Sequence, residues 1–302
     1  MRAPSGSLTR FATTVLVLLV IAACENSSRD DNRVPSGDGQ VLAGAGDISV
    51  CTNTNDEATA KLLDSISGAV FTLGDNVYES GTDAEFRECY DPTWGRHKER
   101  TYPSPGDHEY FTPGASGYFD YFGEAAADPD EGYYSYGLGG WHVVVLNSRC
   151  GQVGGCGDGS PMLRWLKEDL AANPRTCTAA YWHIPLFSSG YHGNDAEMKP
   201  IWDALYAADA DVVLNGHDHS YERFAPQDPD GEADPERGIR QFVVGTGGVA
   251  LRPFEDIQPN SQVRNAETHG ILKLTLRSGG YDWEFVPVEG KTFTDSGSGG
   301  CH

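Results

Sequence analysis

The sequence predicts an α/β fold, a layered sandwich in which the loops that follow the strands carry the functional residues. Short apolar runs of strand length alternate with segments of helical periodicity along much of the chain. The composition agrees, because 37 glycines and 17 prolines in 302 residues suit a loop-rich α/β protein more than a helical bundle. Since open α/β sheets bind ligands beyond the carboxyl ends of their strands, we expect the functional residues at that edge.

The first elements form a βαβ unit, with strands over residues 41–45 and 69–73 and a helix over residues 56–67. A right-handed crossover places the ends of both strands on one rim of the sheet. Residues 79–140 are rich in aromatic residues, glycine and proline, and we expect them to form loops over that rim.

The middle of the chain continues the alternation, and the C-terminal third is expected to be strands joined by turns. The expected helices cover residues 161–172, with apolar spacing at Leu163, Leu166 and Leu170, and residues 196–208. The expected strands cover residues 141–147, 178–182, 211–214, 241–245, 271–276 and 281–286.

The N-terminus is predicted to be a targeting segment. Arg2 and Arg10 precede an apolar run over residues 11–23, which is too short to span a bilayer and has the form of a signal peptide. The run ends in Ile21-Ala22-Ala23-Cys24, which resembles a bacterial lipoprotein cleavage box with Cys24 as the lipid-bearing residue. The alternative is a secretory signal in which Cys24 is incidental, and both interpretations predict export to the cell envelope or the outside.

These boundaries divide the chain into a lipoprotein signal peptide (1–23), a flexible polar tether (24–39) and a single domain (40–302). Setting Cys24 aside, six of the seven cysteines remain, and an even number in an exported protein suggests disulfides. We favour Cys150–Cys156, which flank a flexible glycine-containing loop, and expect Cys51–Cys89 and Cys177–Cys301 with less support. No Cys-x-x-Cys spacing points to a zinc–thiolate site.

The formal net charge of −22 argues against nucleic acid or an anionic membrane surface as a partner. Salt screens this field beyond roughly 10 Å. A small anionic substrate is therefore still compatible with a locally cationic metal centre.

Oxygen and nitrogen donors recur on five turns, most of which follow apolar runs. Each turn alone is a weak signal, because an isolated Asp at a strand end is usually a cap and a lone His-x-His pair is common on surfaces. Their number favours a two-metal hydrolase, whose ions need such donors. The turns are Gly46-Asp47, Gly74-Asp75-Asn76-Val77-Tyr78, Gly106-Asp107-His108-Glu109, His183-Ile184-Pro185 and Gly216-His217-Asp218-His219.

In the order of these motifs, the chain resembles the calcineurin-like metallophosphoesterases, and among them the purple acid phosphatases. The Tyr221-Glu222-Arg223 sequence after the His-x-His pair is specific to the purple acid branch, and the resemblance runs from about Val41 to the C-terminus. We therefore expect a four-layer αββα sandwich with a metal site on the loops at the strand C-termini. The implied activity is hydrolysis of phosphate monoesters by a metal-activated hydroxide.

The resemblance also implies two sets of metal ligands that share Asp75. Asp47, Tyr78 and His219 complete the first set, whose phenolate suits Fe(III). Asp107, His183 and His217 complete the second set, which suits Zn(II), Mn(II) or Fe(II). Of the residues that bind no metal, His108 would protonate the leaving alkoxide or stabilise the transition state, and His192 would contact the substrate phosphate.

One departure from the family pattern concerns Asp107, since the family usually has Asn there. A carboxylate should tighten cation binding at the second site and weaken its attraction for phosphate. Two other functions stay open: a phosphodiesterase or nucleotide pyrophosphatase on the same metals, and a non-catalytic metal-binding surface lipoprotein, for which Asp107 is the only support. Glu109 and Glu222–Arg223 are expected to be scaffold residues, the latter as an internal ion pair.

Overall fold

The structure is a computed structural model that describes residues 1–2 and 39–302. Internal contacts divide the chain into two units, Met1–Pro35 and Ser36–His302, and the description below concerns the second. The predicted lipid-bearing Cys24, and nearly all of the predicted signal peptide and tether, lie outside the described residues. Among the residues described, no helix has the length and apolar character needed to cross a membrane.

The first of two large sheets has six strands in the order β15-β14-β13-β1-β3-β5. Its strands β1, β3 and β5 are parallel, while β13 runs antiparallel to β1. The strands are β1 (Gln40–Ala45), β3 (Ala69–Thr72), β5 (Thr101–Tyr102), β13 (Gly270–Arg277), β14 (Gly280–Pro287) and β15 (Ser296–Gly300).

The second large sheet has seven strands in the order β12-β10-β11-β9-β8-β7-β6. Its centre, from β7 through β8 and β9 to β11, is parallel. The strands are β6 (Tyr134–Leu138), β7 (Trp141–Val145), β8 (Cys177–Tyr181), β9 (Val212–Asn215), β10 (Tyr221–Phe224), β11 (Arg240–Val244) and β12 (Ser261–Asn265). A short two-stranded sheet pairs β2 (Ser49–Val50) with β4 (Val77–Tyr78).

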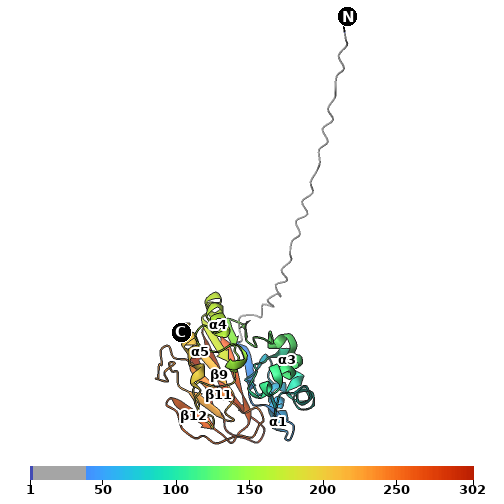
Figure 1. Cartoon of the computed structure of the whole chain (residues 1–302). Coiled ribbons are helices and arrows are strands. Elements are labelled where there is room, and N and C mark those ends of the chain that lie inside the picture. Colours follow the sequence, from blue (N-terminus) through green and yellow to red (C-terminus); the bar gives the residue numbers. More distant parts are fainter. Residues whose placement is uncertain (3–38) are drawn as a thin grey trace. The chain divides into compact units, whose positions relative to one another are not determined.

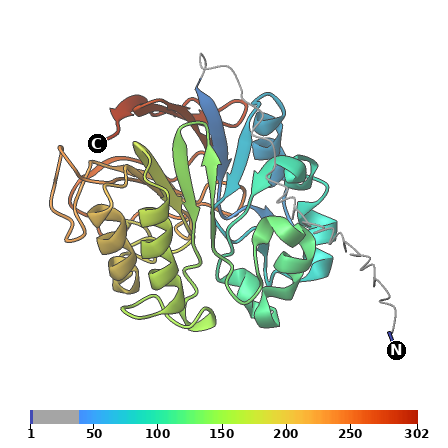
Figure 2. The same ribbon diagram turned by 90° about the horizontal axis from the view of Figure 1, so that it is seen from above.

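Helices cover the outer faces of the two sheets (Figures 1 and 2). The longer helices are α1 (Asn55–Asp64), α3 (Ser116–Phe122), α4 (Pro161–Ala172) and α5 (Lys199–Ala207), with the short α2 at Asp83–Glu85. The short 3-10 or π turns are η1 (Phe86–Tyr90), η2 (Trp94–Arg100), η3 (His108–Phe111), η4 (Pro113–Ala115), η5 (Gly123–Ala126), η6 (Cys150–Gln152) and η7 (Ala196–Met198).

Alternation along β7 shows how the layers stack. Val143 and Val145 belong to the core that includes the six-stranded sheet, whereas Val144 packs with Leu163 of α4 and Leu205 of α5. Such alternation is expected of a strand buried on both faces. The order is therefore helices, sheet, sheet, helices, and the predicted α/β sandwich is confirmed.

The prediction of loops over residues 79–140 is wrong in part, because this segment contains α2, α3 and five of the short helical turns. Several of its aromatic residues are buried against one another: the Phe86 ring lies against those of Tyr90 and Phe122, with centroids 5.7 and 5.9 Å away. Burial of this aromatic cluster stabilises the short helices. Their sequences are too irregular to show helical periodicity. The sequence also failed to indicate β12 and β15, because exposed polar or Gly/Ser strands carry no apolar signal.

The three expected disulfides are present: Cys51–Cys89, Cys150–Cys156 and Cys177–Cys301. Cys177 begins β8 and Cys301 follows β15. This last disulfide therefore links the edge of the six-stranded sheet to the centre of the seven-stranded sheet.

Candidate metal centre

The predicted ligands meet at one edge, where strands of both large sheets end. Asp47 follows β1 and Asp75 follows β3, while His183 follows β8 and His217 follows β9. Backbone hydrogen bonds join the two sheets here, since the Gly46 N–H donates to the Val244 carbonyl at 2.9 Å. Side chains from both sheets consequently face a common space.

Three of these residues have an unusual backbone conformation. Asp47, Asp75 and His217 have φ angles of 59°, 48° and 71°. Non-glycine residues rarely occupy this left-handed region, and those that do concentrate at functional sites.

Close packing restricts the residue at position 106, because a Cβ on Gly106 would lie 2.1 Å from Asp75 Oδ1. Only glycine fits at position 106.

The first group consists of Asp47, Asp75, Tyr78 and His219, all of them buried. The Tyr78 hydroxyl oxygen lies 2.8 Å from Asp47 Oδ1 and 2.7 Å from Asp75 Oδ2. His219 Nε2 lies 3.4 Å from that hydroxyl oxygen and 3.4 Å from Asp47 Oδ1. The phenol has a single proton, so at any moment it can donate a hydrogen bond to only one of its two carboxylate neighbours.

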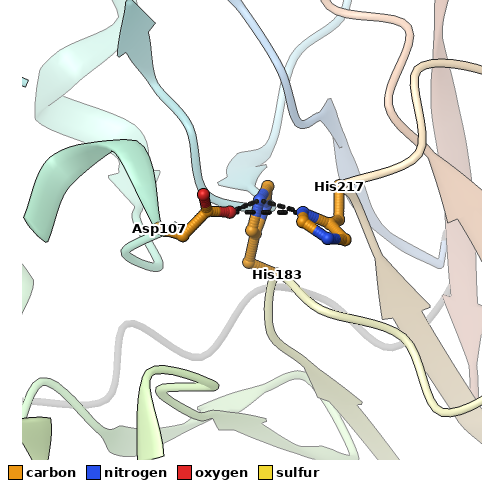
Figure 3. Close-up of side chains that lie close together, drawn as sticks. All are labelled: Asp107, His183 and His217. Carbon is orange, nitrogen blue, oxygen red and sulfur yellow. Dashed lines mark hydrogen bonds and ion pairs between the residues drawn. The ribbon is translucent and has the colours of Figure 1, made fainter. Parts of the chain in front are cut away.

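The second group consists of Asp107, His183 and His217, which come from three separate segments and point toward one another (Figure 3). Asp107 Oδ1 lies 3.1 Å from His183 Nε2 and 3.2 Å from His217 Nδ1. The two imidazole nitrogens are themselves 3.2 Å apart. This one-carboxylate, two-imidazole set has the composition of a transition-metal site.

Asp75 lies between the two groups. Its Oδ2 is 2.7 Å from the Tyr78 hydroxyl on one side and 3.3 Å from His183 Nε2 on the other. Its Oδ1 accepts a hydrogen bond from the His108 backbone N–H at 2.9 Å.

Backbone carbonyls orient two of the imidazoles. His183 Nδ1 lies 2.6 Å from the Leu73 carbonyl, and His219 Nδ1 lies 3.1 Å from the Ala250 carbonyl. A carbonyl only accepts, so each Nδ1 carries the proton and each Nε2 turns its lone pair to the centre when the ring is neutral. Metal-binding histidines are commonly held in this way.

The electrostatics of the centre favour a positive charge. Burial opposes the charged form of His183, yet the Asp75 and Asp107 carboxylates raise its pKa well above the ordinary value. Burial likewise acts to raise the pKa of Asp47, but its contacts with His219 outweigh this and lower it to about 2. Burial, then the charges of Asp47 and Asp75, raise the pKa of the Tyr78 phenol well above its usual value. Clustered carboxylates around a phenol and imidazoles fit metal cations by the chemistry of the donor set.

The two histidines predicted to act on substrate lie beside these groups. His108 Nε2 is 3.9 Å from Asp75 Oδ2, and its Nδ1 is 2.6 Å from the Glu79 carbonyl. The His192 ring lies against His217, with ring centroids 4.1 Å apart. The structure thus gathers all nine predicted site residues, and their individual roles stay predictions.

Comparison with known proteins identifies the family. Residues 42–221 match the family model described as calcineurin-like phosphoesterase. The chain belongs to the calcineurin-like phosphoesterase family. The suspected relationship is therefore confirmed, and the family is one of phosphoester hydrolases.

Among individual relatives of this calcineurin-like phosphoesterase, purple acid phosphatase 15 of Arabidopsis thaliana is 30% identical over 244 residues. That alignment covers 68% of this chain and 44% of the relative. Purple acid phosphatase 23 of the same plant is 29% identical over 245 residues, 68% of this chain and 52% of the relative. The chain spans about half or less of the length of these curated relatives.

Among solved structures, purple acid phosphatase PPD1 from yellow lupin (Lupinus luteus) seeds superposes with a TM-score of 0.68 at 17% identity. The match covers 88% of this chain and 54% of the lupin chain. At this identity the similarity concerns the fold alone, which agrees with the calcineurin-like sandwich described above.

Glu109 organises the loops around the centre of this calcineurin-like phosphoesterase. It is fully buried, and its carboxylate accepts backbone N–H bonds from Gly106 at 2.6 Å, Asn76 at 2.7 Å and Asp75 at 3.0 Å. Burial, then the Asp75 charge, raise the pKa of Glu109 to about 8, against these hydrogen bonds. The expected scaffold position of Glu109 agrees with these contacts.

The expected ion pair between Glu222 and Arg223 is wrong, because neighbours on a strand point to opposite faces. Glu222 accepts from the Ser189 backbone N–H at 2.9 Å, and Arg223 Nε pairs with Asp295 Oδ2 at 2.6 Å. Each side chain still ties loops to the seven-stranded sheet.

Sequence reasoning missed one segment of the site, the loop over residues 245–252. The Val249 N–H donates to the Asp47 carbonyl at 3.1 Å, and the Arg252 N–H donates to the His219 carbonyl at 3.0 Å. Gly245-Thr246-Gly247-Gly248 directly after a strand was the available signal. It carries no metal-ligating side chain, so a pattern of donor residues does not reveal it.

Proposed function

We propose that this calcineurin-like phosphoesterase hydrolyses phosphate monoesters at a centre of two metal ions. The observation that carries the proposal is the position of Asp75, whose Oδ2 faces Tyr78 of one donor group and His183 of the other. A carboxylate shared by two donor groups is what a pair of cations requires.

The proposed ligands follow the two groups of side chains. Asp47, Asp75, Tyr78 and His219 would hold the first ion, and the phenol oxygen favours Fe(III) there. Asp107, His183 and His217 would hold the second ion together with Asp75, and their mixed donors suit Zn(II), Mn(II) or Fe(II). When bound, such ions supply an activated water and stabilise charge on the phosphate.

The chain's own residues would then position substrate and move protons. His108 is held through Nδ1 by the Glu79 carbonyl, which leaves Nε2 facing the centre. In its imidazolium form the ring carries a second proton on Nε2, which it would deliver to the leaving alkoxide to become neutral. Phe111 packs on the His108 ring with centroids 4.7 Å apart and limits its movement.

The proposed setting is outside the cytoplasm. Three disulfides support the predicted export, since such bonds persist in oxidising compartments. Attachment to a membrane through lipid on Cys24 remains a separate prediction.

Turnover by the metal-loaded protein tests the activity. We expect hydrolysis of 4-nitrophenyl phosphate, much slower hydrolysis of bis(4-nitrophenyl) phosphate, and loss of both activities on chelation of the metals. A preference for the diester would instead support a phosphodiesterase. Two bound metals with no turnover on either ester would support the non-catalytic alternative.

A further inference from the structure

The Arg252 guanidinium lies beside the second group of proposed ligands. Arg252 Nη1 is 2.9 Å from His192 Nε2, and the His192 ring packs against His217. Among residues 39–302, Arg252 forms no ion pair within 4.0 Å. Its charge is therefore available to an anionic ligand at this place beside the centre.

Three contacts fix the position of Arg252. Its backbone N–H donates to the His219 carbonyl at 3.0 Å, which ties it to a proposed ligand of the first metal. Its guanidinium lies over the Tyr191 ring, 5.2 Å from the centroid, an arrangement typical of a cation–π contact. His192 provides the third contact, and its own backbone N–H is held by Asp218 Oδ1 at 2.8 Å.

The chemistry of the Arg252–His192 pair assigns the donors. A guanidinium only donates, so His192 Nε2 must accept the hydrogen bond from Arg252. In this arrangement that nitrogen cannot also donate to a phosphate oxygen. Arg252 keeps further N–H groups, and a planar guanidinium suits phosphate oxygens.

We infer that Arg252 is the residue that contacts the substrate phosphate, that His192 and Tyr191 position it, and that it makes the site selective for phosphate monoesters. This inference rests on the proposed function. It reassigns the phosphate contact from His192 to Arg252 and makes His192 a positioning residue.

Selectivity follows from counting oxygens. A monoester has three non-ester oxygens and a diester has two. If a pair of metal ions engages two of them, only a monoester has another oxygen and a second negative charge for Arg252. Loss of the guanidinium should therefore affect monoesters more than diesters, which a merely structural role would not do.

The test compares the metal-loaded full chain with its Arg252→Gln and Arg252→Lys variants, with Arg175→Gln as a control on an exposed site. We expect Arg252→Gln to raise KM for 4-nitrophenyl phosphate by about tenfold to a hundredfold, the range of one charge-assisted hydrogen bond. kcat/KM for bis(4-nitrophenyl) phosphate should change much less. Arg252→Lys should recover part of the loss, and Arg175→Gln should match the wild type. Equal losses on both esters, or none, would overturn the inference.

A binding measurement separates this inference from the proposed function. Calorimetric titration of the metal-loaded protein with inorganic phosphate needs no turnover, and metal content shows whether each variant is intact. We expect phosphate affinity to fall about tenfold or more in Arg252→Gln. Unchanged affinity would refute the role of Arg252 even if the wild type is active. If the wild type hydrolyses neither ester but Arg252→Gln binds phosphate more weakly than the wild type, the proposed function is refuted and the role of Arg252 stands.

Discussion

At the scale of single residues, the Asp107 carboxylate beside the two imidazoles supports a prediction. Asp107→Asn removes one negative charge 3.1 Å from His183 Nε2. Asp75 and Tyr78, in contrast, were within reach of sequence reasoning because their chemistry is local: a carboxylate follows an apolar strand and a phenol comes three positions later. The structure places the Tyr78 hydroxyl oxygen 2.7 Å from Asp75 Oδ2. Arg252 was out of reach, because its significance depends on contacts with His192 and Tyr191 that no local pattern reveals.

For Asp107→Asn, the loss of that charge should act on both the substrate and the second metal. We expect kcat/KM for 4-nitrophenyl phosphate to rise several-fold to about tenfold, or the pH optimum to shift, while affinity for the second metal falls. Steady-state kinetics across pH at saturating metal would check this. An identical kcat/KM and an identical pH profile would refute it.

At the scale of elements, the strands with apolar runs were predictable and the polar or aromatic segments were not. β1 and β3 appear where expected, because burial on both faces demands continuous apolar sequence. β15, a Ser/Gly strand, exists through its pairing with β14, which is a tertiary property. The helical turns of residues 83–126 likewise depend on mutual burial of their aromatic residues.

The turns around the centre depend on Glu109, which gives a prediction about stability. In Glu109→Gln, the amide NH₂ would face backbone N–H donors of Asp75, Asn76 or Gly106, leaving buried donors without an acceptor. At pH 9, where the Glu109 carboxyl is ionised, we expect the free energy of unfolding of the metal-free protein to fall by about 2 kcal/mol. Denaturant titration beside Glu131→Gln, an exposed control, would measure it. A loss no larger than that of the control would contradict the role given to Glu109.

At the scale of the whole molecule, two sheets converge at one edge to form the centre, and the opposite edge carries a separate junction. There Asp211 accepts the Thr178 backbone N–H at 2.8 Å and the His302 N–H at 3.1 Å, beside the Cys177–Cys301 disulfide. The sequence indicated this pair of cysteines, but not the buried carboxylate between the two segments they join.

Asp211 predicts a specific pH dependence of stability. Burial raises the pKa of Asp211 to about 6 from its ordinary 3.8, against the hydrogen bonds from Thr178 and His302 and the charge of His302. The folded state therefore holds this proton more tightly than the unfolded chain. The resulting stabilisation is complete below pH about 4 and is lost as pH rises through about 6, by about 3 kcal/mol.

The Asp211→Asn variant should not show this loss of stability with rising pH. Between pH 4 and pH 7, the free energy of unfolding of the wild type should therefore fall relative to that of the variant. Parallel curves for the two proteins would show that Asp211 titrates normally.

The central claim, two unlike metal ions that share Asp75, is tested most directly by metal analysis of the purified protein together with its visible spectrum. We expect about two metal ions per chain, one of them iron, and a broad phenolate-to-iron band that Tyr78→Phe abolishes. One ion or none per chain, or a band that survives Tyr78→Phe, would contradict it.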